Sequence, residues 1–223
     1  SYFLNEIKAY SAEVTLGCTS DTDDAEGNIL NIAKKIPDSS KVILALNSFL
    51  GESLQKAPFY SALKHKGKPL YKYAREGELI EKPPREIKII DISNIHFQNP
   101  LLEFDITCSK GTYIRSIARD IGNLLECGGY LSKLKRTQQG CFEISDANFT
   151  KDLFTDHIIS IESAFPQFNS LELNELEENI YKNGGRVESI KGNEEILKIY
   201  SSSKKFMGLG EVNDSGLKLK QLV

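Results

Sequence analysis

Residues 108–125 read CSKGTYIRSIARDIGNLL, and this stretch predicts the best-defined helix of the chain. From a start near Thr112, apolar side chains recur at helical spacing, at Ile114, Ile117, Ala118, Ile121, Leu124 and Leu125. Gly128 is placed to end the helix, because glycine adopts the left-handed backbone that is common at helix ends. The apolar stripe predicts that one face of this helix packs on the core.

The start of this helix has two features that suit a negatively charged ligand. Gly111 lets the backbone approach a ligand closely, and the N–H groups of the first turn favour an anion. Arg115 and Arg119 project together away from the apolar stripe, and Arg115 is placed to reach a carboxylate or a phosphate. A surface arginine in an ion pair of little energetic value is the simpler interpretation of these residues taken alone.

The remaining elements of the first 150 residues are expected to be strands and shorter helices. Tyr10, Ala12, Val14 and Leu16 would share one face of a strand over residues 10–17. The other expected elements are a helix from an N-cap at Ser39 or Ser40 to Gly51, a short helix from Pro69 to Gly77, extended runs over 86–97 and 101–108 around a turn at Asn99-Pro100, and strand over most of 130–143.

Composition changes near residues 150–170, which suggests a domain boundary. Beyond it we expect a short helix from Asn174, strands over 196–201 and 205–212, and a turn at residues 213–216 before a last strand. This tail reads as a small β-rich domain of about sixty residues.

The whole-chain numbers exclude several classes of protein. The chain has 223 residues, of which 40% are hydrophobic and 26% charged, as is ordinary for a folded soluble protein. No apolar run approaches the roughly 20 residues that span a bilayer, and the chain does not open on a signal peptide. Because it begins at Ser1 rather than at methionine, we interpret it as cut from a longer protein.

Metal binding is not expected. The four cysteines form no CxxC pair, and the three histidines are scattered without the spacing of a zinc site. Free thiols in a reducing cytosol are the simpler interpretation, and they place the protein in the cytoplasm.

Charge is segregated along the chain, although the net charge is only −3. Residues 19–27, TSDTDDAEG, predict an acidic loop, whereas residues 57–75, APFYSALKHKGKPLYKYAR, mix basic side chains with aromatic rings. Lysines neutralise phosphates, and tyrosines stack on unpaired bases, so the second phrase suits RNA. A third phrase, GGYLSKLKRT at 128–137, adds basic residues. Solvated lysines beside core aromatic and leucine side chains remain the alternative for both basic phrases.

Together, in this order and spacing, the four phrases resemble the tRNA pseudouridine synthase B (TruB) family of bacterial type. The resemblance implies an α+β fold: a pseudouridine synthase core with a mixed, largely antiparallel sheet and flanking helices, followed by a small β-rich PUA-like domain. On this basis residues 1–155 are the core, N-terminally incomplete, and residues 160–223 are the PUA-like C-terminal domain.

The resemblance also implies roles for individual residues. Tyr10 matches the aromatic residue that stacks on the extruded uracil, Arg115 the arginine that pairs with the catalytic aspartate, Tyr113 its neighbour in the pocket, and Leu134 an apolar wall beside the base. Contacts to the RNA backbone would come from Lys64, Lys68, Lys110, Lys133, Lys135 and Arg136. A flipped base needs such a platform, and an arginine keeps a carboxylate nucleophile ionised.

The catalytic aspartate itself is not expected in this chain. In the family it lies in a glycine-rich stretch ending Leu-Asp-Pro, upstream of the residue matched by Tyr10. This chain has seven prolines, and none of them follows an aspartate. Asp21, Asp23 and Asp24 match a different loop, so we do not interpret them as substitutes. The chain as given is therefore expected to be inactive.

The resemblance implies a function, namely isomerisation of the T-loop uridine (uridine 55) of tRNA to pseudouridine. The expected partner is the T-arm stem-loop of tRNA, with no membrane, no metal and no cofactor, and the protein is expected to be a monomer. The alternative is a non-catalytic module that binds or folds tRNA. An unrelated β-rich protein-binding domain would leave the ordered phrases unexplained.

Overall fold

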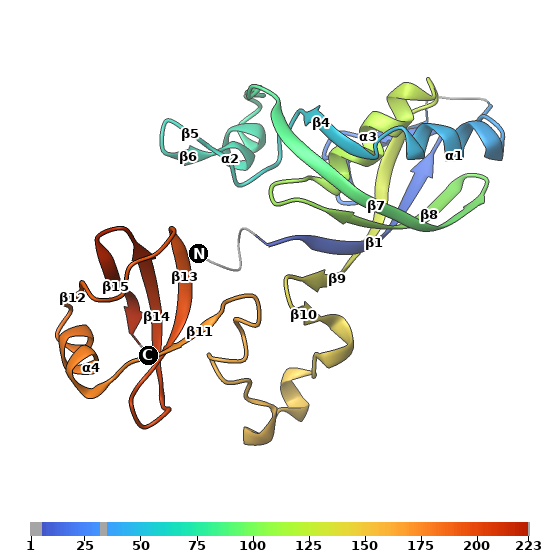
Figure 1. The fold of residues 1–223 in the computed structure, drawn as a ribbon. Helices are drawn as coiled ribbons and strands as arrows, with labels where there is room; N and C mark the ends of the chain where they lie inside the picture. Colours follow the sequence, from blue (N-terminus) through green and yellow to red (C-terminus); the bar gives the residue numbers. More distant parts are fainter. Residues whose placement is uncertain (1–5, 32–34, 223) are drawn as a thin grey trace. The chain divides into compact units, whose positions relative to one another are not determined.

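The structure, a computed structural model, describes residues 6–31 and 35–222 of the chain (Figure 1). Contacts divide the chain into two compact units, residues 1–147 and 148–223. Each unit has its own sheet and its own cluster of buried apolar side chains.

The first unit is built on a six-stranded antiparallel sheet with the order β10-β9-β1-β8-β7-β4. Its strands are β1 (Lys8–Leu16), β4 (Gly51–Gln55), β7 (Arg85–Gln98), β8 (Leu101–Cys108), β9 (Gly129–Gln139) and β10 (Phe142–Glu143). The apolar face predicted for β1 is confirmed, because Ala12, Val14 and Leu16 are buried in the core, although Glu13 on the other face is buried as well. The predicted hairpin of β7 and β8 is also confirmed, with its turn at Asn99-Pro100.

Two helices cover one face of this sheet, α1 (Ser39–Asn47) and α3 (Ile114–Leu124) (Figure 1). The apolar stripe of α3 is buried as predicted from Ile114 to Ile121, but its predicted last turn is not, because Leu124 is 57% exposed and Leu125 only half-buried. The N-cap of α1 is Asp38 rather than Ser39 or Ser40, since the Asp38 carboxylate accepts a hydrogen bond from the N–H of Lys41 at 3.1 Å. Serine and aspartate cap helices about equally well, so the sequence pattern did not separate these neighbours.

Short elements carry the loops at the edge of the first unit. Strands β2 (Cys18–Ser20) and β3 (Ile29–Asn31) form one hairpin around the acidic loop. Strands β5 (Lys64–His65) and β6 (Lys68–Pro69) form another, which leads directly into α2 (Leu70–Arg75). A 3-10 turn, η2 (Ile144–Asp146), closes the unit.

The second unit is β-rich, as predicted. Its five-stranded sheet has the order β11-β13-β14-β15-β12, and β11 alone runs parallel to its neighbour. The elements are η3 (Thr150–Asp152), η4 (Thr155–His157), β11 (Ser170–Glu172), α4 (Glu175–Lys182), β12 (Arg186–Val187), β13 (Glu195–Tyr200), β14 (Phe206–Asn213) and β15 (Gly216–Leu222). The predicted helix start at Asn174 is confirmed, with Glu177 completing a capping box.

The α+β fold class predicted from the sequence is therefore confirmed. None of the helices in the described ranges is long and apolar enough to cross a membrane. Cys108 and Cys127 are buried thiols, Cys18 is half-buried, and Cys141 is exposed.

Candidate uridine pocket and RNA-binding residues

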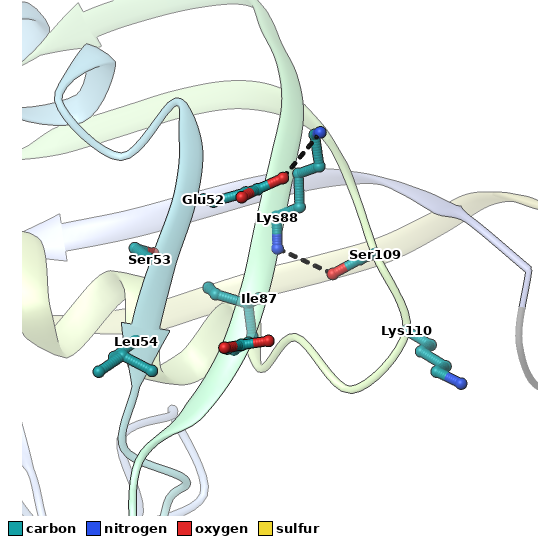
Figure 2. Close-up of a pocket in the computed structure, with 8 residues that line it drawn as sticks. Glu52, Ser53, Leu54, Ile87, Lys88, Ser109 and Lys110 are labelled. Carbon is teal, nitrogen blue, oxygen red and sulfur yellow. Dashed lines mark hydrogen bonds and ion pairs between the residues drawn. The ribbon is translucent and has the colours of Figure 1, made fainter.

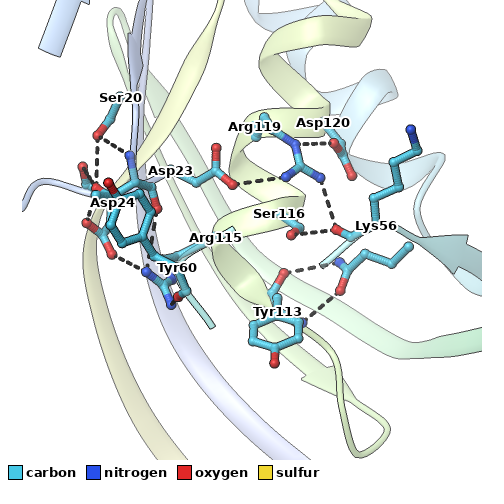
Figure 3. A network of polar contacts seen from close by, with 12 residues as sticks. Ser20, Asp23, Asp24, Lys56, Tyr60, Tyr113, Arg115, Ser116, Arg119 and Asp120 are labelled. Atoms are coloured by element: carbon cyan, nitrogen blue, oxygen red, sulfur yellow. Dashed lines mark hydrogen bonds and ion pairs between the residues drawn. The ribbon is translucent and has the colours of Figure 1, made fainter. Parts of the chain in front are cut away.

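Arg115, in the first turn of α3, joins three segments that are far apart in the sequence (Figure 3). Its guanidinium donates to the Asp24 carboxylate at 2.7 Å, to the Thr22 carbonyl at 3.5 Å and to the Tyr60 carbonyl at 2.9 Å. The Arg115 and Asp24 side chains are 26% and 20% exposed, so this ion pair is partly shielded from water. Shielding makes such a pair stronger than a fully solvated one.

Asp24 uses both of its carboxylate oxygens. Oδ2 accepts from Arg115, while Oδ1 accepts from the Thr22 hydroxyl at 2.6 Å and from the Glu26 N–H at 3.1 Å. The acidic loop is thus folded around Asp24, and its carboxylate faces the start of α3 (Figure 3).

One turn further along α3, Arg119 repeats this arrangement. It donates to Asp23 at 2.9 Å, to Asp120 at 2.9 Å and to the Lys56 carbonyl at 3.1 Å. Burial raises the pKa of Asp23, and the Arg119 charge opposes that rise. Burial lowers the pKa of Arg119, but its bonds to Asp120 and Asp23 outweigh that effect and the pKa is raised. Two arginines on successive turns therefore bind two consecutive aspartates.

A pocket of about 810 Å³ opens beside Arg115. Its walls combine the acidic loop, with Asp21 and Asp24, and the aromatic rings of Tyr60, Tyr71 and Tyr113. Ser61 also lines it, and the buried Ser61 hydroxyl has no hydrogen-bond partner in the described part of the chain.

Cations lie over two of these rings. The Arg75 guanidinium is 5.5 Å from the centre of the Tyr71 ring, and the Arg85 guanidinium is 5.8 Å from that of Tyr113. Such pairs hold a ring in a defined orientation, and Arg75 also lines the pocket. The pocket thus combines flat aromatic faces, cations and an arginine–carboxylate pair.

The structure brings two of the four predicted pocket residues together, Tyr113 and Arg115. Tyr10, on β1, is half-buried against the core, and burial raises the pKa of its phenol. Leu134, on β9, is 46% exposed and lines a separate cavity of about 450 Å³. Among the described residues, neither Tyr10 nor Leu134 is part of the wall around Arg115.

The predicted RNA-binding cations of the 57–75 phrase differ in their contacts. Lys64 is exposed on the β5–β6 hairpin. Lys68 forms an ion pair with Glu76, and its ammonium lies 4.5 Å from the centre of the Tyr73 ring.

Lys110 lines a second cavity of about 590 Å³, beside β4 and β7 (Figure 2). In the same cavity Lys88 donates to Glu52 at 3.1 Å, and Ser109 accepts from the Lys88 N–H at 2.9 Å. This cavity is distinct from the one around Arg115.

The basic group on β9 is only partly available to a ligand. Lys133 binds the buried carboxylate of Glu13 at 2.8 Å, and this bond raises the pKa of Lys133. Lys135 and Arg136 follow on the same strand, and both are exposed.

Sequence reasoning missed the partners of the arginines. The structure shows Asp24 as the carboxylate that binds Arg115 and Asp23 as the one that binds Arg119, and it adds Gln55, which binds the backbone of Tyr113. One signal was present, because two arginines face away from the core and two consecutive aspartates occupy one loop. The pairing itself depends on how the loop reaches the helix.

The arrangement can hold a flat, polar ligand and stabilise negative charge beside it. Within the ranges the structure describes, no group of three or more His, Cys, Asp or Glu side chains could hold a metal ion. The charged groups that line the pocket are the carboxylates of Asp21, Asp24 and Glu26 and the guanidinium groups of Arg75 and Arg115.

Comparisons with solved structures agree on the fold. The chain superposes with a TM-score of 0.69 on a structure of an H/ACA RNP bound to a substrate RNA containing 2'-deoxyuridine, at 16% identity, covering 99% of this chain and 67% of that one. It superposes with a TM-score of 0.68 on a Cbf5-Nop10-Gar1 complex, at 19% identity, covering 98% and 67%. At these identities the likeness shows the fold alone.

Sequence comparisons are more specific. Residues 1–114 match the N-terminal domain of the TruB family pseudouridylate synthases, and residues 115–176 match the tRNA pseudouridylate synthase B C-terminal domain. The chain is 40% identical over 235 residues to tRNA pseudouridine synthase B of Clostridium novyi, covering 100% of this chain and 80% of the relative. It is 43% identical over 195 residues to the protein of that name from Francisella philomiragia, covering 82% and 64%. The chain belongs to the TruB family of pseudouridylate synthases.

Proposed function

We propose that this chain binds the T-arm of tRNA and receives a flipped uridine in the pocket beside Arg115, as part of a tRNA pseudouridine synthase. Family membership and relatives named tRNA pseudouridine synthase B support the reaction class and the RNA. The observation that carries the proposal is the set of three tyrosines around one partly shielded arginine.

The chemistry of pseudouridylation suits this pocket. A uridine inside a folded RNA has to leave its stack, which costs a few kcal/mol, and aromatic faces repay part of that cost. The glycosidic bond between N1 and the ribose then breaks, the uracil rotates, and C5 bonds to the ribose; the proton on C5 is lost to a base or water, and N1 takes up a proton. A carboxylate nucleophile in the pocket has to stay ionised, and the Arg115 guanidinium is placed to favour its charged form.

Asp24 is the carboxylate nearest to this role, but its contacts argue for a supporting one. Its two oxygens accept three hydrogen bonds from within the protein, from Arg115, Thr22 and Glu26. An attacking oxygen has to exchange such partners for the substrate. We propose that Asp24 orients Arg115 and that a carboxylate outside these 223 residues is the nucleophile.

The other two aspartates of the loop are also held by hydrogen bonds within the protein. Asp23 binds Arg119 at 2.9 Å, away from Arg115. Asp21 accepts from the side chain and the N–H of Asn28, and these bonds lower its pKa. The hydrogen bonds of both carboxylates stabilise the conformation of the loop.

We further propose that the uridine is that of the T-loop and that the exposed cations Lys64, Lys135 and Arg136 contact phosphates. Lys68, Lys110 and Lys133 are proposed for the same role, Lys68 and Lys133 after exchanging their protein partners for RNA. Tyr10 and Leu134 are proposed to face the base once RNA is bound. The protein is proposed to act in the cytoplasm, as a monomer and without a cofactor.

A second candidate is a non-catalytic module that binds or folds tRNA. One observation favours it, namely that Arg115 is already paired with Asp24 inside this chain. An arginine that is paired in this way can line a pocket without stabilising the charge of a nucleophile.

The test uses the 223-residue chain and a T-arm stem-loop that carries 5-tritiated uridine, with RNA binding and tritium release followed together. We expect binding without release. If the RNA does not bind, the proposal is wrong. If tritium is released, one of the carboxylates of this chain is the nucleophile, and the supporting role of Asp24 has to be abandoned.

A further inference from the structure

Gln55, the last residue of β4, has a long polar side chain that is only 2% exposed. The three residues before it on the strand, Glu52, Ser53 and Leu54, are exposed. A buried primary amide is costly unless its donor and its acceptor both find partners.

Both partners of the Gln55 amide belong to one residue, Tyr113. The Gln55 oxygen accepts from the Tyr113 N–H at 2.8 Å, and the Gln55 nitrogen donates to the Tyr113 carbonyl at 3.1 Å. Only one orientation of the amide matches both groups, since the Tyr113 N–H is a donor and its carbonyl, which also accepts from the Ile117 N–H at 3.2 Å, is an acceptor. The side chain therefore pairs with the backbone as a neighbouring strand would.

Tyr113 needs this partner because of its place in the fold. It is the N-cap residue of α3, in an extended conformation with φ −102° and ψ 111°, and its own side chain makes no capping hydrogen bond. Its N–H lies outside the hydrogen-bond ladder of the helix, where such groups require an external acceptor. Gln55 supplies that acceptor and so holds the backbone of Tyr113, which lines the pocket.

Other hydrogen bonds between the end of β4 and the start of α3 are separate from the Gln55–Tyr113 pair. The Ser116 hydroxyl donates to the Lys56 carbonyl at 2.9 Å, and Arg119 donates to the same carbonyl at 3.1 Å. These bonds join α3 to the residue after Gln55, but they do not involve the backbone of Tyr113. Ser116 is fully buried, which makes it a matched position for comparison.

We propose that Gln55 is a positioning residue of the uridine pocket, which acts by fixing the backbone and hence the ring of Tyr113. This inference rests on the proposed function, because it assigns Gln55 to the same pocket. It predicts that the amide can be replaced only by a group that both accepts from the N–H and donates to the carbonyl of Tyr113.

The first measurement follows the ring itself. The chain is labelled with 3-fluorotyrosine, and the ¹⁹F resonance of Tyr113 is assigned by its loss in Tyr113→Phe. In Gln55→Leu we expect this resonance to move or broaden. In the control Ser116→Ala, which removes a buried bond from a nearby residue of the same helix, we expect it to stay in place. An unmoved Tyr113 resonance in Gln55→Leu would overturn the inference.

The second measurement uses Gln55→Glu and pH. A protonated glutamic acid has one donor and one acceptor, like the amide, whereas an ionised glutamate repels the Tyr113 carbonyl. Burial raises the pKa of a carboxyl group, so protonation falls within an accessible range. We expect the Tyr113 resonance of this variant to return towards its wild-type position at low pH, while the wild-type resonance does not change. A resonance that is independent of pH in Gln55→Glu contradicts the inference, even if Gln55→Leu fails to fold.

The third measurement links the ring to RNA. We expect Gln55→Leu to weaken binding of the T-arm stem-loop about tenfold, since base stacking on a displaced ring is lost, and Ser116→Ala to leave it unchanged. A displaced Tyr113 with unaltered affinity would also overturn the proposed role. If the wild-type chain does not bind the RNA, the proposed function fails, while the fluorine measurements still decide whether Gln55 positions Tyr113.

Discussion

Arg115 and Arg119 each connect an acidic side chain of the 19–27 loop with a backbone carbonyl of the segment after β4. A guanidinium has five donors in a rigid plane, so it can serve a carboxylate and a carbonyl at once. This geometry makes the two arginines the joint between three segments. The two arginines stabilise the protein more by connecting these segments than by either ion pair alone.

Replacing Arg115 by methionine is expected to destabilise the first unit. Asp24 and the Tyr60 carbonyl would both lose a partly buried donor, and leaving such groups unpaired costs about 1–3 kcal/mol. Urea unfolding measures the loss. The control is Lys88→Met, because Lys88 and Glu52 form a pair with 56% and 78% exposed side chains, which is worth at most about 1 kcal/mol. Equal losses in both variants would contradict the joint role of Arg115.

We expect the stability of the second unit to depend on pH because of Glu178 on α4. Hydrogen bonds from Lys182 and from the backbone and hydroxyl of Ser202 lower its pKa from 4.5 to about 2. Because the folded state binds this proton less tightly than the unfolded chain, the carboxylate stabilises the fold above pH 4.5. That contribution is lost as the pH falls towards 2.

Thermal unfolding between pH 5 and pH 2 checks this expectation. Glu178→Gln should reduce the fall in melting temperature over that range. Glu175→Gln, which removes an exposed carboxylate from the same helix, should leave the fall unchanged. The attribution to Glu178 is wrong if the two variants behave alike.

The packing of α3 on β9 depends on glycine where the helix meets the strand. A Cβ built on Gly122 would lie 2.1 Å from the Gly129 nitrogen and 2.3 Å from the Gly128 carbonyl carbon. These are backbone atoms, which cannot move aside as a flexible side chain can. The sequence predicted the helix and an end near Gly128, but it carried no sign that Gly122 had to be small.

Gly122→Ala is therefore expected to destabilise the protein although alanine favours helices. The gain in helix propensity is about 1 kcal/mol, whereas overpacking of a rigid interface costs about 1–3 kcal/mol or more. The free energy of unfolding in urea measures the balance. Asn123→Ala, at the exposed next position, gains the propensity without the close approach and should be neutral or stabilising. An equal or greater stability of Gly122→Ala would show that the helix moves away at little cost.

Some elements were predictable and others were not, for physical reasons. α3, α4, β7 and β8 have strong periodicity or capping residues, and the sequence predicted them closely. β4 reads GESLQ, which has little strand propensity, and we did not predict it. It exists because it pairs with β7 across residues 51–55 and 85–89. Its position then decides where Gln55 lies.

At the scale of the whole molecule, the proposed RNA binding depends on where the exposed basic side chains lie. The net charge is −3, yet Lys64 and Arg136, from distant parts of the chain, are both exposed in the first unit. Local positive potential steers an RNA backbone even when the total charge is negative. Each lysine or arginine that binds a phosphate adds to the salt dependence of binding.

Lys64→Glu and Arg136→Glu are each expected to weaken binding of the T-arm stem-loop. Each should also lower the slope of log affinity against log salt by roughly 0.7–0.9 for every phosphate that the variant no longer neutralises. Filter binding at several salt concentrations measures both quantities. Lys41→Glu, the same change at an exposed position on α1, is the control. If all three variants keep the wild-type slope, the assignment of the RNA-binding surface is wrong.

The amino-acid order was sufficient for the fold class, the main helices and strands, and the family, because periodicity, caps and ordered motifs are local in the chain. It also singled out Arg115 and Tyr113. The partners of these residues depended on folding: Asp24 meets Arg115 across 91 positions, and Gln55 meets Tyr113 across 58. Such pairings follow from sheet register and helix packing, which bring distant segments within hydrogen-bonding distance and leave no trace in local sequence.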